Sequence, residues 1–77
     1  MRLLDTVVLA GALNPADRYH TRAEAHLEGL SREPQLFIPA VVLIEFDLLM
    51  KARGYSPSER HETWFELTPK IPTEKIL

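Results

Sequence analysis

The chain begins with an apolar run, RLLDTVVLAG, that limits what it can fold into. Its aliphatic and β-branched residues, from Leu3 to Leu9, are typical of a strand that is buried on both faces of a sheet. An ionised side chain inside such a strand costs several kcal/mol unless a partner compensates for the lost water. Asp5 stands in the middle of the run and therefore needs either a partner or a function.

Start and stop signals divide the rest of the chain into short elements. Asn14 and Pro15 form a helix start, Gly54 is a residue that can end a helix in the left-handed conformation, and Ser56 with Glu59 forms a capping box. These signals predict helices at Pro15–Ser31, Ala40–Arg53 and Pro57–Leu67, a second strand at Gln35–Ile38, and a third strand or a loop over Lys70–Leu77.

This alternation of strand and helix predicts an α/β fold in the order β-α-β-α-α, with a third strand left open. Because the first strand is apolar throughout, its neighbours are expected to be parallel and helices are expected to cover both faces. The predicted architecture is a three-layer α/β/α fold with a short parallel sheet, and 77 residues are enough for at most one small domain.

Composition excludes some classes of function. The chain has no cysteine, which rules out disulfides and thiolate zinc sites, and it has no apolar run of the ~18 residues that a membrane span needs. We expect a cytoplasmic protein. The net charge of -2 gives no global attraction to nucleic acid, so phosphate binding requires a local basic surface or bridging metal ions.

Helical spacing suggests a second inward carboxylate. Glu45 shares a stripe with Val41, Leu48 and Ala52, whereas Asp47 lies about 200° away and is expected to face solvent. Asp5 and Glu45 then converge at the carboxyl edge of the sheet, where Mg²⁺ or Mn²⁺ would suit their oxygen ligands. The alternative is that Asp5 accepts hydrogen bonds from a helix N-terminus and that Glu45 reaches solvent at the edge of its stripe.

Three segments, LLDTVVL, NPADRYHTRAEAHLEGL and IPAVVLIEFDLLMKARGYS, resemble the N-terminal half of a PIN domain, the metal-dependent ribonuclease family that includes VapC-type toxins. The resemblance implies that Asp5 and Glu45 are the catalytic residues that bind Mg²⁺ or Mn²⁺, and that Thr6 supports the metal site. It also implies an RNA substrate and, for a toxin, an antitoxin protein as partner.

The family's domain is longer and carries further acidic residues, so the resemblance implies that this chain holds an incomplete site. It also implies that residues 1–77 are the N-terminal part of a single PIN-like domain, with an open edge on the first strand and apolar residues without partners. We therefore expect the chain to be either the surviving part of a longer domain or a homo-oligomer such as a dimer. A non-catalytic interaction module derived from the PIN fold is the alternative function.

Other side chains support weaker hypotheses. Trp64 and Phe65 are assigned to the core in preference to base stacking. Scattered basic residues on the helices are either solvated or part of a local phosphate-binding surface: Arg18, Arg22, Lys51 and Arg53.

Overall fold

The computed structural model describes all 77 residues. Helical segments make up 64% of the chain, and the sheet has two strands. The elements are β1 (Arg2–Leu3), α1 (Thr6–Ala12), α2 (His20–Glu28), β2 (Leu36–Phe37), α3 (Ala40–Ala52) and α4 (Pro57–Leu67). The prediction of a three-layer α/β/α fold is wrong, because this is a small helical domain with a minimal sheet.

The apolar run at the N-terminus forms a strand of two residues followed by a helix. β1 pairs with β2 in parallel, with Arg2 opposite Leu36, so the predicted parallel pairing is confirmed. From Thr6 onward the chain is helical, and Val7 is exposed where a doubly buried strand would hide it. The long first strand was a wrong prediction because Asp5 caps a helix start inside the run.

The second helix begins later than Asn14 and Pro15 predicted. The oxygen Oδ1 of Asn14 accepts a hydrogen bond from the Ala16 amide, and Oδ1 of Asp17 accepts one from the Tyr19 amide. These local bonds stabilise turns that compete with the helix, so α2 starts only at His20. A 3-10 turn, Gly29–Ser31, follows it directly.

The third and fourth helices follow their predicted signals. α3 ends at Ala52, and Gly54 has a φ of 88°, the left-handed conformation expected after a helix. α4 starts at Pro57, and both hydrogen bonds of the capping box between Ser56 and Glu59 are present.

The C-terminal segment does not form the third strand that was considered. It makes two 3-10 turns, Thr68–Lys70 and Thr73–Lys75. A single parallel bridge between Ile38 and Ile76 is its only contact of the β type. This bridge still lies on the side of β2 away from β1, so β1 keeps a free outer edge.

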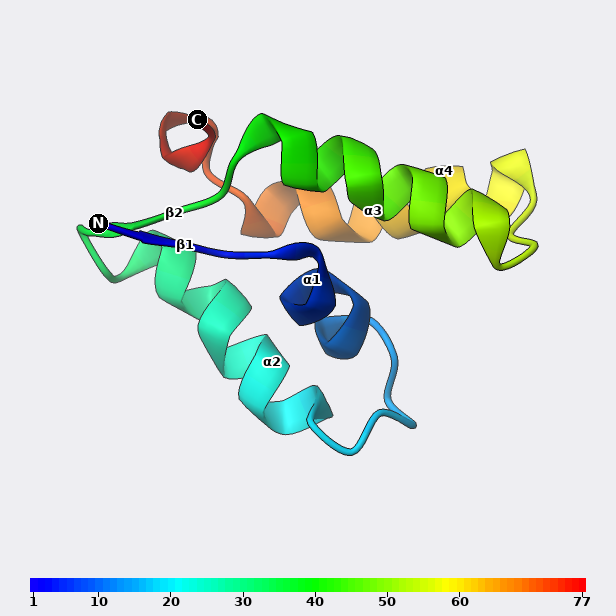
Figure 1. The fold of residues 1–77 in the computed structure, drawn as a ribbon, viewed down its shortest axis with the longest axis horizontal. Coiled ribbons are helices and arrows are strands. Elements are labelled where there is room, and N and C mark those ends of the chain that lie inside the picture. Colours follow the sequence, from blue (N-terminus) through cyan, green and yellow to red (C-terminus); the bar gives the residue numbers. More distant parts are fainter.

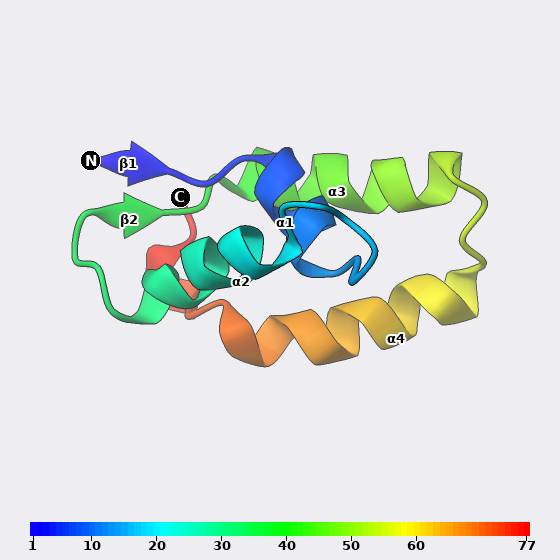
Figure 2. The ribbon, with the colours of Figure 1, turned by 90° about the horizontal axis from the view of Figure 1, so that it is seen from below.

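The helices form two pairs. α1 packs against α2, α3 runs antiparallel to α4, and the two strands lie side by side at one end (Figures 1 and 2). Four fully buried side chains come from four different segments: Leu9, Leu30, Ile38 and Leu67. Phe65, assigned to the core from the sequence, is instead 78% exposed. No helix combines the length and the apolar character that crossing a membrane requires.

Candidate metal centre

Asp5 lies between the end of β1 and the start of α1. Its backbone is extended, and its oxygen Oδ1 accepts a hydrogen bond of 3.2 Å from the Val8 amide. The aspartate is therefore the N-cap of α1, where a negative charge also suits the helix dipole. Asp5 is exposed, which removes the cost of burial that its place in the apolar run suggested. Thr6, the first residue of α1, is half-buried beside it.

Glu45 lies in the middle of α3 and is also exposed. The predicted core stripe through Val41, Glu45 and Leu48 is wrong, because both apolar members are 58% exposed. The buried stripe of α3 is Val42, Phe46 and Met50, spaced four residues apart. Glu45 consequently points to solvent, and no ion pair engages its carboxylate.

Each of the two carboxylates belongs to a helix, or to the cap of a helix, that follows one of the two parallel strands. β1 and β2 are parallel, so α1 and α3 both start at the carboxyl edge of the sheet. Asp5 caps α1, Glu45 is carried by α3, and these two helices pack against each other. Figure 1 shows both helices leaving the strands on the same side.

The chemistry of these residues fits a hydrated divalent cation. Because the Val8 amide engages only Oδ1 of Asp5, the oxygen Oδ2 is free, and both oxygens of Glu45 are free. The structure brings together no group of three or more His, Asp or Glu side chains with the geometry of a metal site. A cation held here would have few protein ligands and would keep several waters, which is the usual coordination of Mg²⁺.

Asp47 has a structural role that the sequence did not suggest. It was predicted to face solvent, but its Oδ1 accepts a hydrogen bond of 2.8 Å from the indole Nε1 of Trp64. Arg60 lies 3.6 Å from the same oxygen, and the Trp64 ring meets Phe46 edge-on with 5.7 Å between the ring centroids. Asp47 thus links α3 to α4, a role that depends on how the two helices pack.

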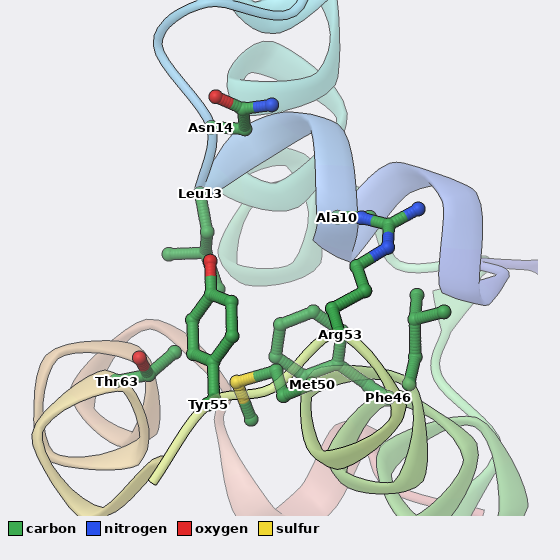
Figure 3. Close-up of a pocket in the computed structure, with 9 residues that line it drawn as sticks. Ala10, Leu13, Asn14, Phe46, Met50, Arg53, Tyr55 and Thr63 are labelled. Atoms are coloured by element: carbon green, nitrogen blue, oxygen red, sulfur yellow. The ribbon is translucent and has the colours of Figure 1, made fainter. Parts of the chain in front are cut away.

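A cavity of about 70 Å³ lies between α1, α3 and the middle of α4, where Thr63 lines it (Figure 3). Phe46 and Met50 line it from α3, and the side chains of Arg53 and Tyr55 flank its opening. Its volume is well below the 300–1,000 Å³ of a typical small-molecule site. It is therefore better described as a packing gap than as an active-site pocket.

The chain matches no protein-family model, no curated protein and no solved structure. The resemblance to PIN domains therefore rests on the sequence motifs around Asp5 and Glu45.

Proposed function

We propose that the chain is a metal-dependent endoribonuclease of the PIN type, with Asp5 and Glu45 as ligands of Mg²⁺ or Mn²⁺ and Thr6 supporting the site. One observation supports this most. The aspartate at the end of β1 and the glutamate of the helix after β2 are both exposed, and their helices pack together at the carboxyl edge of a parallel strand pair. Ligands bind at this edge in open parallel sheets.

Each residue has a distinct part in this activity. Asp5 offers one free oxygen to the cation while its other oxygen fixes the first turn of α1, so the fold holds its carboxylate in place. Glu45 offers a second carboxylate from the neighbouring helix. When bound, the metal ion supplies a water of lowered pKa and neutralises charge on the scissile phosphate of RNA. The proposal includes a cytoplasmic location and, if the protein is a toxin, an antitoxin partner.

The test is Mg²⁺-dependent cleavage of RNA by the Asp5→Asn and Glu45→Gln variants. Asn is as good an N-cap as Asp, so Asp5→Asn removes the charge and leaves the start of α1 intact. We expect both variants to lose cleavage and to bind Mn²⁺ more weakly in calorimetry. Glu62→Gln, an exposed carboxylate on α4, is the matched control. Cleavage that survives Asp5→Asn would contradict the proposal.

A second candidate function, a non-catalytic interaction module, is favoured by the exposed face of α3. Val41, Ile44 and Leu48 are 58%, 61% and 58% exposed, and their spacing places them on one side of the helix. Contiguous apolar surface of this kind marks interaction sites. On this reading the chain forms a homodimer through α3, and Ile44→Lys converts the dimer to a monomer in sedimentation velocity. A wild-type chain that stays monomeric at high micromolar concentration would exclude it.

A further inference from the structure

An open groove of about 350 Å³ lies between α1 and α2. Val7, Val8 and Gly11 line it from α1, while Ala23, Arg22 and His26 line it from α2. Its volume falls within the range of small-ligand sites, unlike that of the cavity beside Tyr55. The two helices lie side by side in both views (Figures 1 and 2).

An exposed aromatic ring, Tyr19, and an arginine without an ion-pair partner, Arg22, line the groove, and Arg18 lies beside the ring. Tyr19 is 53% exposed at the start of α2, and the guanidinium carbon of Arg18 lies 5.0 Å from the centroid of its ring. Arg22 and His26 follow Tyr19 at helical spacing, so the three side chains share one face. Neither Arg18 nor Arg22 takes part in any ion pair.

One carboxylate also lines the groove. Asp17 lines the groove, and its Oδ1 accepts a hydrogen bond of 2.8 Å from the Tyr19 amide. Asp17 keeps its charge, but Arg22 in the groove and Arg18 beside the Tyr19 ring outnumber it, so the groove and its Tyr19 edge carry a net positive charge although the whole chain carries a net charge of -2. An anionic ligand with a flat ring matches this combination better than an apolar or acidic protein helix, because only the ring uses the exposed face of Tyr19.

We infer that this groove holds one nucleotide of a single-stranded RNA, with its base stacked on Tyr19 and its phosphates contacted by Arg22 and Arg18. The inference rests on the proposed function and extends it to the substrate. Val7 in the groove wall belongs to the first turn of α1, which Asp5 caps, so a strand in the groove runs next to the candidate metal ligand. Stacking accepts any base, so binding is expected to be weakly dependent on sequence.

The test measures the binding of a fluorescein-labelled ten-nucleotide oligouridine to the full chain by fluorescence anisotropy, in a buffer that contains EDTA. Without metal, no cleavage occurs and no cation bridges the carboxylates to RNA. We expect Tyr19→Ala to weaken binding about 5- to 10-fold, from loss of one stacked base. Tyr19→Phe keeps the ring and should bind within about twofold of wild type. Arg22→Ala should lower the slope of log affinity against log salt by about 0.7, the value for one phosphate on a single strand.

Two variants outside the groove serve as controls. Tyr55→Ala removes another exposed aromatic ring and Arg32→Ala another exposed arginine, and both should bind as wild type does. Equal losses from these controls, or no binding by the wild-type chain at millimolar concentration, would overturn the inference.

Asp5→Asn separates this inference from the proposed function. If Asp5→Asn abolishes Mg²⁺-dependent cleavage but not binding in EDTA, and binding depends on Tyr19 and Arg22, both proposals are supported. If binding depends on Tyr19 and Arg22 but neither the wild type nor any variant cleaves RNA, the groove inference is supported and the nuclease proposal is refuted. If cleavage depends on Asp5 but binding is indifferent to Tyr19 and Arg22, the groove inference falls alone.

Discussion

Replacing Asp47 with Ala should destabilise the chain, although the sequence places this residue on a solvent-facing side of α3. The indole N–H of Trp64 donates to Asp47 over 2.8 Å, and a hydrogen bond to a charged group contributes about 1.5–3 kcal/mol. Both side chains are only partly buried, so water replaces some of the lost bond and the lower end applies. The ion pair with Arg60 adds at most about 0.5 kcal/mol.

The gain in helix propensity from Asp to Ala offsets about 0.5 kcal/mol, which leaves a net loss of about 1–1.5 kcal/mol. For a chain of this size, with a urea m-value of about 1 kcal/mol/M, the unfolding midpoint should fall by about 1–1.5 M. Trp64 is the only tryptophan, so its fluorescence reports this transition directly. Glu45→Ala, an exposed carboxylate on the same helix, should shift the midpoint by less than about 0.5 M.

A double-mutant cycle isolates the bond itself. Trp64→Phe removes the indole N–H and keeps a ring that can meet Phe46 edge-on, as Trp64 does. In that background, Asp47→Ala should cost less than about 0.5 kcal/mol when unfolding is followed by circular dichroism. An Asp47→Ala midpoint equal to that of Glu45→Ala, or an undiminished cost in the Trp64→Phe background, would refute the role given to this hydrogen bond.

Three further predictions concern stability. Gly54→Ala should cost about 1–2 kcal/mol in urea unfolding, because a side chain is strained at a φ of 88°. Nothing lies near the position of the added Cβ, so the loss comes from the backbone alone, and an unchanged midpoint would contradict this. Leu67→Ala should cost about 2–5 kcal/mol, or prevent folding, since Leu67 is fully buried; a loss below about 1 kcal/mol would show that it is not in the core. The hydrogen bonds from Ser56 lower the pKa of Glu59, so its carboxylate stabilises the fold above its ordinary pKa, and this contribution is lost as the pH falls through the lowered value. Glu59→Gln should therefore flatten the acid limb of a stability profile measured by thermal melts, and an unchanged acid limb would argue against the capping box.

Capping signals in the sequence predicted the ends of α3 and α4, because those ends depend on residues close along the chain. Ser56 and Glu59 are close along the chain, and their capping box forms whatever packs on α4, so the bounds of that helix were correct. Gly54 likewise ends α3 through its own backbone freedom. The pairing of β1 with β2 was also predictable, because a helix between two short strands favours a parallel arrangement.

The sequence did not predict which side of α3 is buried. Between Val41 and Met50 every residue except Glu45 and Asp47 is apolar, so several stripes satisfy helical spacing equally well. Because α3 packs against α1 and α4, the buried stripe is the one that contains Phe46. Glu45 is therefore exposed, and Asp47 accepts a hydrogen bond from Trp64. The candidate ligand Glu45 was thus identified by motif, while the reason first given for its orientation was wrong.

The sequence by itself determined where α3 and α4 start and stop, because their caps are formed by residues a few positions apart. The tertiary structure decided how α1 packs, since α2 lies so close that a Cβ on Gly11 would be 3.1 Å from the Cβ of Ala23. It also decided which carboxylates are free to bind a cation. Exposure depends on contacts between segments that are distant in the chain, and local spacing carries no information about those contacts.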